Sequence, residues 1–384
     1  MAKYKLGDIC TIVSGSTPKT GIEEYWKGNL KWITPAEIEE DTYIIGDSER
    51  KITELAVKKT GLSSFPKGTV ILSSRAPIGK VAIAGCEMYC NQGFKNLICS
   101  EKINNKYLYW FLKRNTKYLN SLGRGATFKE ISKTIVSEIE INLPEYRKQE
   151  KISNELEKIN KIIGCRKQEL KLFEDLVKAR FVEMFGTLNN PSQEFTKATL
   201  KELCNKITDG KHGGCKVEEG TERYFVGARE IYDDEVHYDT APEINVDEFE
   251  KDYKRCNIEI GDFLIVNTGA TIGKSAITTD ERTEHTLLQK SVALLKVKKE
   301  LLNPVFLKWC YRVNTQMYIV ESASAQPNLL LSKINSTVIY VPDMELQNQF
   351  ADFVTQVNKS KVAVQKALDE TKLLFDSLMQ KYFG

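Results

Sequence analysis

The stretch that most resembles a catalytic loop is "TGATIGKS" at 268–275. A loop of the pattern G-x-x-x-x-G-K-[ST] binds nucleotide phosphates when it runs directly into a helix. Here Thr268 occupies the position that requires the first glycine, and the residues after Ser275 are β-branched and turn-forming. The pattern predicts a β-hairpin. A nucleotide-dependent enzyme built on this loop is the less favoured alternative.

Other catalytic patterns are missing from the sequence. It contains no G-x-S-x-G elbow, no H-E-x-x-H pair and no Asn/Asp-Pro-Pro-Tyr/Phe motif of amino-methyltransferases. Its nine cysteines include no C-x-x-C pair, and its three histidines lack ligand spacing, which predicts reduced thiols and no zinc site. We therefore expect this chain to carry no catalytic residue, no metal and no cofactor.

A different chemistry, recognition of DNA bases and phosphates, requires Arg, Lys, Asn, Gln, Ser and Thr side chains in loops. Such residues recur at matching places in the two halves of the chain. The candidates in the first half are Ser73, Ser74, Arg75, Lys80, Asn91, Gln92, Lys95, Asn96, Arg124, Thr127 and Lys129. The candidates in the second half are Lys211, His212, Arg229, Asn267, Thr268, Lys274, Gln289, Lys290, Gln326 and Asn328.

The places match because the sequence is duplicated. "LSSRAPIGKVAIA" (72–84) aligns without a gap with "VNTGATIGKSAIT" (266–278), and "YLYWFLKRNT" (107–116) aligns with "FLKWCYRVNT" (306–315). Further matches occur in the same order, with an offset that drifts only from about 193 to 200. Collinear matches of this kind indicate a tandem repeat.

Each copy begins with a globular domain, at 1–143 and at 187–341, that we expect to be α+β. Runs such as "GTVILSS", "KVAIAG", "FKNLIC", "DFLIVNT" and "SVALLKV" are typical of strands. A helix is expected at about 104–121. Its counterpart should begin at Asn303-Pro304, a capping residue followed by proline.

Each copy ends with a long helix, at 144–186 and at 342–384. Both segments open with Pro and an acidic residue and close with Gly, which are helix start and stop signals. Apolar residues follow +4/+3 spacing, which is typical of a heptad seam. The predicted seam residues are Ile152, Leu156, Ile159, Ile163, Leu170, Phe173, Val177, Met184, Phe350, Val354, Val357, Val364, Leu368, Phe375, Leu378 and Tyr382.

The order of these parts predicts their geometry. The chain runs domain, helix, domain, helix, and a helix of about 40 residues spans roughly 60 Å. The second helix can lie against the first only by running back. We therefore expect an antiparallel coiled coil with pseudo-two-fold symmetry and with Gly384 close to Met1. The alternative is two independent helices, each packed on its own domain.

Charge is distributed unevenly along the chain. The net charge is +3 overall, but residues 1–145 carry 21 basic and 16 acidic side chains, whereas 187–342 carry 19 and 23. A basic patch usually marks a nucleic-acid binder, so the second domain argues mildly against that role. No apolar run is long enough to span a membrane and no signal peptide opens the sequence, so a cytoplasmic protein is expected.

Several short motifs resemble the specificity subunit of type I restriction-modification enzymes. They are "SGSTPKTG" (14–21), "LKWITPAEI" (30–38), "CNQG" (90–93), and "INLPEYRKQEKI" (141–152), which is echoed by "YVPDMELQNQF" (340–350). Gln149 and Gln347 hold the glutamine typical of the helix start. The second copy departs from the pattern, with "TDGKHGG" (208–214) and "LQK" (288–290), which suits domains that read different sequences.

The resemblance implies a function. Each globular domain would be a target-recognition domain that reads one half of a bipartite, asymmetric site in double-stranded DNA, and the helices would set the spacer and help to dock two methyltransferase subunits. The chain itself would be non-catalytic. S-adenosylmethionine for adenine methylation, and ATP and Mg²⁺ for a motor-nuclease subunit, would be bound by partners. The competing interpretation is a tandem-repeat DNA-binding or scaffold protein outside restriction.

Overall fold

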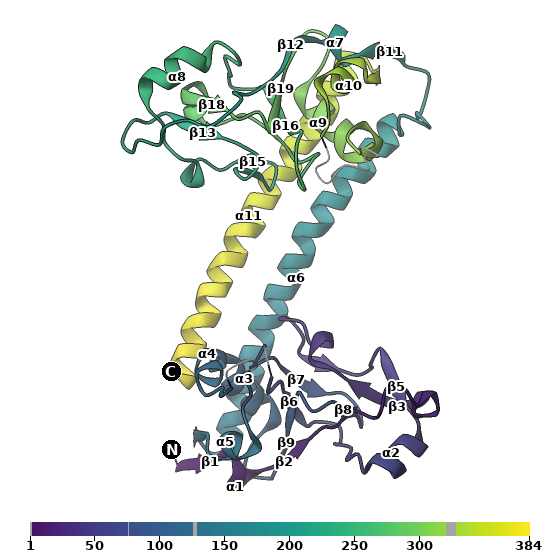
Figure 1. The fold of residues 1–384 in the computed structure, drawn as a ribbon, viewed down its shortest axis with the longest axis vertical. Coiled ribbons are helices and arrows are strands. Elements are labelled where there is room, and N and C mark those ends of the chain that lie inside the picture. The colour runs from purple at the N-terminus through teal and green to yellow at the C-terminus, as the bar shows by residue number, and fades with distance from the viewer. Residues whose placement is uncertain (1, 76, 126–128, 320–327) are drawn as a thin grey trace. The chain divides into compact units, whose positions relative to one another are not determined.

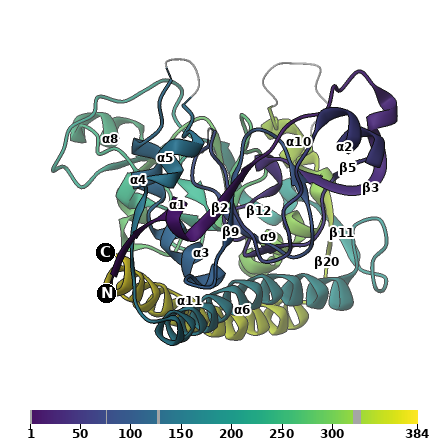
Figure 2. The same ribbon diagram turned by 90° about the horizontal axis from the view of Figure 1, so that it is seen from below.

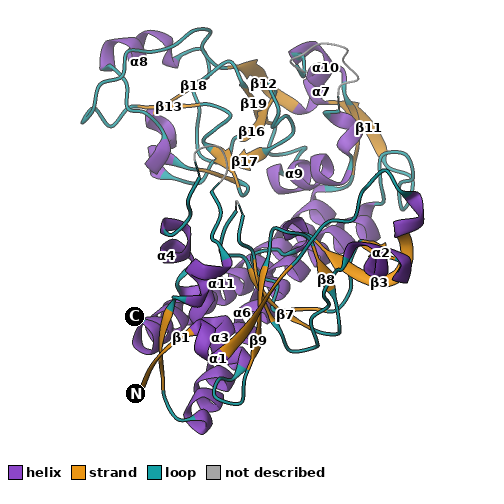
Figure 3. Ribbon diagram, turned by 60° about the horizontal axis from the view of Figure 1, so that its bottom comes forward, coloured by secondary structure: helices purple, strands orange, loops and turns teal. Residues whose placement is uncertain are grey.

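The computed structural model describes residues 2–75, 77–125, 129–319 and 328–384. The chain forms two compact units, which we call unit 1 (Met1–Lys167 with Lys366–Gly384) and unit 2 (Gln168–Gln365). Each unit combines one globular domain with parts of both long helices. Helices and strands are mixed throughout each domain (Figures 1 and 3), which confirms the α+β class.

Unit 1 is built around a five-stranded sheet of order β2-β9-β6-β7-β4. Beside it lie a three-stranded sheet, β5-β3-β8, and the pair β1-β10. The strands predicted from "GTVILSS", "KVAIAG" and "FKNLIC" are β6, β7 and β9. The bounds are β1 Ala2–Lys5, β2 Cys10–Ser14, β3 Trp26–Ile33, β4 Ile44–Ile45, β5 Arg50–Ile52, β6 Val70–Leu72, β7 Val81–Ala84, β8 Tyr89–Cys90, β9 Lys95–Cys99 and β10 Glu140–Leu143.

Unit 2 repeats this topology. Its sheet β12-β19-β16-β17 corresponds to β2-β9-β6-β7, its pair β11-β20 to β1-β10, and its parallel pair β13-β18 to β3-β8. The hairpin β14-β15 completes the domain. The bounds are β11 Thr196–Thr199, β12 Cys204–Asp209, β13 Tyr224–Val226, β14 Ile231–Tyr232, β15 Glu235–Val236, β16 Phe263–Val266, β17 Ser275–Ile277, β18 Thr286–Leu288, β19 Val292–Val297 and β20 Val338–Val341.

Short helices cover these sheets. They are α1 Leu6–Ile9, α2 Glu54–Thr60, α3 Asn105–Arg114, α4 Thr116–Ser121 and α5 Lys133–Ser137 in unit 1, and α7 Leu200–Leu203, α8 Val246–Tyr253, α9 Pro304–Val313 and α10 Leu331–Ser336 in unit 2.

Helix α9 begins as predicted, because the side chain of Asn303 accepts a hydrogen bond from the amide of Val305 at 2.9 Å. The prediction of one helix over 104–121 was wrong. Asn115 interrupts it between α3 and α4, and the Asn115 side chain donates to the carbonyl of Phe111 at 2.8 Å. A side chain that bonds the backbone locally competes with helix continuation.

The two long helices are α6 Tyr146–Phe185 and α11 Met344–Phe383, labelled in Figures 1 and 2. Gly164 does not interrupt α6, in keeping with its cost of at most about 1 kcal/mol. Every predicted seam residue is buried or half-buried. The heptad spacing therefore identified the face of each helix that is covered.

Both helices contribute to both cores. In unit 1 the beginning of α6 and the end of α11 run antiparallel, because Tyr382 donates to Glu155 at 2.7 Å while Arg166 bonds Thr371. In unit 2 the ring of Phe181, from the end of α6, lies 5.3 Å from that of Phe350 in α11. The alternative of two helices that each pack only on their own domain is therefore wrong.

The predicted return of Gly384 toward the start of the chain is supported by one cluster in unit 1. Tyr4 and Phe383 pack against the same buried core, while Met1 itself lies outside the described residues.

Among the described residues, no helix combines the length and apolarity of a membrane span.

Candidate nucleic-acid interface

In unit 1, five loops are tied together by main-chain hydrogen bonds. We call this set loop cluster 1; it comprises 15–17, 33–35, 73–75, 90–93 and 130–131. A loop network of this kind holds side chains rigidly at a surface, as a reading surface requires. The bonds are Ser16 N to Cys90 O (3.0 Å), Asn91 N to Ile33 O (3.1 Å), Ser74 N to Gly93 O (2.7 Å) and Ile131 N to Ser74 O (2.9 Å).

Unit 2 contains the same network, which we call loop cluster 2; it comprises 210–212, 226–228, 266–268, 288–291 and 328–329. The correspondence is one for one, so the main chain is conserved between the copies while the side chains differ. The bonds are Lys211 N to Leu288 O (2.7 Å), Gln289 N to Val226 O (2.8 Å), Asn267 N to Ser291 O (3.0 Å) and Leu329 N to Asn267 O (2.7 Å).

These bonds establish which candidate residues are equivalent. Because their main chains occupy the same network positions, each residue of cluster 1 has one counterpart in cluster 2. Among the pairs that differ are Arg75 with Thr268, Asn91 with Gln289, Gln92 with Lys290, and Glu130 with Asn328. Two surfaces with one backbone and different side chains suit the reading of two different sequences.

The hairpin between β16 and β17 contains the loop that resembles a phosphate site. A strand, not a helix, follows Ser275, so its amide groups do not converge on an anion as they do at a helix start. Gly273 has φ 93°, and a Cβ there would lie 2.4 Å from the ring of Tyr318. The glycine is thus needed for the turn itself. The hairpin prediction is confirmed, and this geometry does not fit a phosphate-binding loop.

Most predicted DNA-contacting residues lie at the surface. The side chains that are exposed are Arg75, Gln92, Arg124, Lys129, His212, Arg229, Lys274, Lys290 and Asn328. Those that are half-buried are Lys80, Asn91, Lys211, Thr268 and Gln289. Thr127 and Gln326 lie outside the described residues.

Five other candidates, Ser73, Ser74, Lys95, Asn96 and Asn267, are buried. The hydroxyl of Ser73 accepts from the amide of Lys80 at 2.8 Å and donates to the carbonyl of Pro77 at 2.7 Å. These side chains shape the loops from inside, so the prediction that they contact DNA directly is corrected.

Lys211 is surrounded by acidic side chains. Its ammonium group lies 2.8 Å from Asp252 and 3.2 Å from Glu248, both on α8. The hydrogen bond to Asp252, followed by that to Glu248, raises the pKa of Lys211. Its charge is therefore already matched within the domain.

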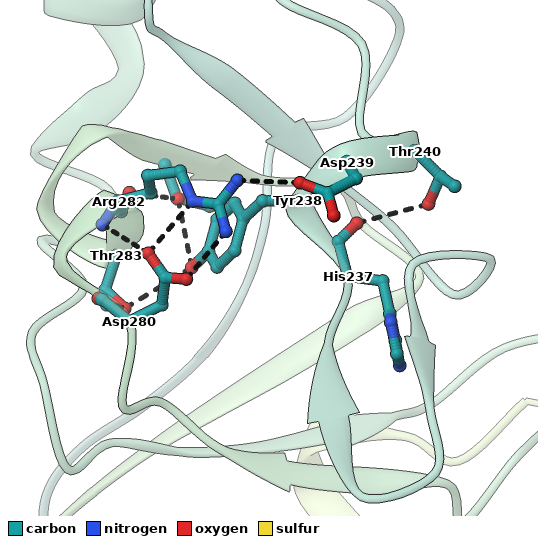
Figure 4. Close-up of polar contacts among 8 residues, drawn as sticks. His237, Tyr238, Asp239, Thr240, Asp280, Arg282 and Thr283 are labelled. Atoms are coloured by element: carbon teal, nitrogen blue, oxygen red, sulfur yellow. Dashed lines mark hydrogen bonds and ion pairs between the residues drawn. The ribbon is translucent and has the colours of Figure 1, made fainter. Parts of the chain in front are cut away.

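Arg282, which the sequence did not single out, is also fully engaged. Figure 4 shows its guanidinium between Asp280 and Asp239. Nε and Nη2 donate to Asp280 at 3.0 and 2.8 Å, Nη1 donates to Asp239 at 3.0 Å, and the group stacks 4.8 Å above the ring of Tyr238. All three guanidinium nitrogens donate hydrogen bonds within the domain, so this arginine has a structural role.

Arg75 differs from Arg282 in its surroundings. Its Nε donates to Glu130 at 2.9 Å, and the other oxygen of Glu130 accepts from Lys95 at 3.2 Å. Partial burial raises the pKa of Glu130, but the hydrogen bonds from Arg75 and then Lys95 outweigh this effect and lower the pKa. This carboxylate is therefore charged at neutral pH. Next to it is an open depression of about 630 Å³, lined in part by Tyr118 and Arg124.

The helix-start glutamines join each long helix to its domain. Gln149 accepts from the amide of Asn104 at 2.9 Å and donates to the carbonyls of Lys102 and Pro144, both at 3.0 Å. Gln347 makes the same three contacts in unit 2, with Asn303, Leu301 and Pro342 at 2.9, 3.2 and 2.7 Å. Both side chains are buried.

Two units with one topology, one loop network and different loop side chains define a duplicated α+β protein with two related but non-identical surfaces. A family model described as the type I restriction modification DNA specificity domain matches residues 1–172 and again 192–371. The chain therefore belongs to the type I restriction-modification specificity family.

Individual relatives agree with this membership. The chain is 29% identical to the type I restriction enzyme MjaIX specificity subunit of Methanocaldococcus jannaschii, over 98% of this chain and 91% of the relative. A shorter match, 30% identical over 28% of this chain and 27% of the relative, is to the EcoprrI specificity subunit of Escherichia coli.

Solved structures share the fold. The S subunit of a type I system from M. genitalium superimposes with a TM-score of 0.59 at 16% identity, covering 100% of this chain and 96% of that one. A chain from a structure concerned with complex assembly and conformational transition of the type I R-M system gives a TM-score of 0.62 at 17% identity, covering 100% and 97%.

Proposed function

We propose that this protein is the DNA sequence-specificity subunit of a type I restriction-modification complex, in which loop clusters 1 and 2 each read one half of a bipartite, asymmetric site. The observation that carries the proposal is the shared main-chain network with different side chains. A common scaffold presents both surfaces in the same way, while Arg75 and Glu130 of one are replaced by Thr268 and Asn328 of the other. Such a pair reads two unlike sequences.

In this proposal the long helices form an antiparallel pair that sets the spacer between the half-sites. The support is that each helix has a covered heptad face and contributes to both cores. Gln149 and Gln347 fix the start of each helix to its own domain. A rigid helix with fixed ends transmits a set distance, at about 1.5 Å per residue.

Catalysis would belong to partners. Two methyltransferase subunits would bind S-adenosylmethionine and methylate adenine, which must be turned out of the helix stack to react. A motor-nuclease subunit would use ATP and Mg²⁺. This chain would determine which DNA sequence the complex binds.

Association with partners would also supply much of the phosphate contact that dominates DNA affinity. The support is the excess of acidic side chains in 187–342 and the internal pairing of Lys211 and Arg282. We expect weak, salt-sensitive DNA binding by the chain alone and tight, sequence-selective binding with the methyltransferase.

The test is a salt titration of binding to DNA fragments, with and without a co-expressed methyltransferase. Tight selective binding by the isolated chain at physiological salt contradicts the proposal that partners supply much of the phosphate contact. Binding without any sequence preference in the presence of the methyltransferase contradicts the specificity role and favours the scaffold interpretation.

A further inference from the structure

We propose that Arg75 reads a guanine in one half-site, and that Glu130 and Lys95 are the residues that position it. This inference rests on the proposed function and deepens it by assigning a base to a side chain. It starts from three charged residues that three different segments of unit 1 bring together, namely the β6–β7 hairpin, strand β9 and the segment before α5.

The three side chains form a graded series from the core to the surface. The Lys95 side chain is 8% exposed, that of Glu130 34% and that of Arg75 44%. Lys95 is held at the base by the hydroxyl of Ser74 at 3.2 Å and binds one oxygen of Glu130. The other oxygen accepts from Nε of Arg75. The Glu130 carboxylate thus bridges the buried Lys95 and the exposed Arg75 and holds the arginine side chain in place.

Main-chain bonds fix the same residues independently. Arg75 and Glu130 pair as an isolated β-bridge, and the amide of Ile131 donates to the carbonyl of Ser74 at 2.9 Å. Both the main chain of Arg75 and the Nε of its guanidinium are therefore held in place. An arginine that is already ordered loses little conformational entropy when it binds.

The outer edge of this guanidinium is open. Within the part of the chain that the structure describes, Arg75 uses only Nε, and its two terminal nitrogens have no hydrogen-bond partner. Arg282, in contrast, has all three nitrogens occupied. Two parallel N–H donors on a planar group match the O6 and N7 acceptors of guanine in the major groove, and no other base presents that pair of acceptors.

The counterpart in unit 2 lacks every charge of this series. Thr268 replaces Arg75, Asn328 replaces Glu130, and Ala293, which pairs with Asp209 as Lys95 pairs with Ser14, replaces the lysine. The hydroxyl of Thr268 bonds the side chain of Asn328 at 3.3 Å. The guanine contact is therefore assigned to unit 1 alone, and the two half-sites should differ at this position.

The experiment uses the full chain with its methyltransferase partner on a DNA library that varies each base pair of the methylated motif. Arg75→Ala should remove the preference for one G·C pair in one half-site, by roughly 5- to 150-fold, the range expected for one bidentate base contact. The other half-site and the spacer should not change. Thr268→Ala, the matched control at the equivalent position, should leave that G·C pair intact.

The positioning role has its own readout. Glu130→Gln should weaken the preference for the same G·C pair by less than Arg75→Ala does. The double variant should lose no more than Arg75→Ala alone, because Glu130 acts through Arg75. Additive losses, or a loss of thermal stability without any change in base preference, overturn the positioning role.

The outcomes separate the two levels of the argument. If the wild-type complex yields no bipartite motif, the proposed function fails and this inference fails with it. If the wild-type motif is bipartite but Arg75→Ala leaves it unchanged, or lowers methylation equally for all sequences, only this inference fails. A uniform loss would mean that Arg75 contacts a phosphate instead of a base.

Discussion

Removing the side chain of Gln149 tests how firmly each long helix is joined to its domain. Gln149→Ala eliminates three hydrogen bonds to main-chain groups and leaves the amide of Asn104 and the carbonyls of Lys102 and Pro144 without this partner. Each hydrogen bond contributes about 0.5–1.5 kcal/mol net to stability, and leaving a buried main-chain group without a partner destabilises the fold further. We expect unit 1 to lose on the order of 3 kcal/mol.

The assay is chemical denaturation combined with hydrogen exchange of the segment around Asn104. A loss of about 3 kcal/mol corresponds to roughly a hundredfold faster exchange. Gln347→Ala should have the same effect on the segment around Asn303, because its three contacts are equivalent. Gln356→Ala, on an exposed position of α11, is the matched control. The reasoning is refuted if all three variants behave alike.

Three further predictions concern the hairpin and the helices. Gly273→Ala should lower the melting temperature more than Gly269→Ala, since both have φ near 95° but only Gly273 would place a Cβ against Tyr318; equal shifts would show that crowding is irrelevant. Lys274→Ala should leave ATP binding as in the wild type, measured by calorimetry, and a loss of ATP affinity would restore the nucleotide interpretation. Inserting four residues into the middle of both α6 and α11 should lengthen each by about 6 Å and widen the spacer by no more than about two base pairs, with both half-sites retained. Altered half-sites would contradict the proposal that the helices set only the spacer.

Much of the fold could be predicted because it depends on local and periodic signals. The seam of α6 and α11, the cap at Asn303 and the hairpin at 268–275 each follow from spacing or from one residue's conformational preference. Phe181 and Phe185 were not predicted, because they lie off the heptad spacing, yet both rings pack against Phe306 of α9 and Phe350 of α11. The break at Asn115 was missed because the apolar pattern continues across it.

The candidate site was harder to predict, because residue type does not show burial. Ser73, Asn96 and Asn267 look like contact residues in the sequence but lie inside the domain. Lys211 looks like a free cation, yet α8 supplies its acidic partners from about 40 residues away. Glu130 was not selected, since an acidic residue looks unsuited to DNA until its contact with Arg75 is known.

The central claim is that two unlike reading surfaces act at a set distance, and genome-wide sequencing of methylated bases tests it most directly. In a host that produces this chain with the proposed methyltransferase partner, we predict one asymmetric motif of two specified parts separated by a fixed number of unspecified base pairs. A single contiguous motif, two identical half-sites, a variable spacer, or methylation that does not depend on this chain would contradict the account.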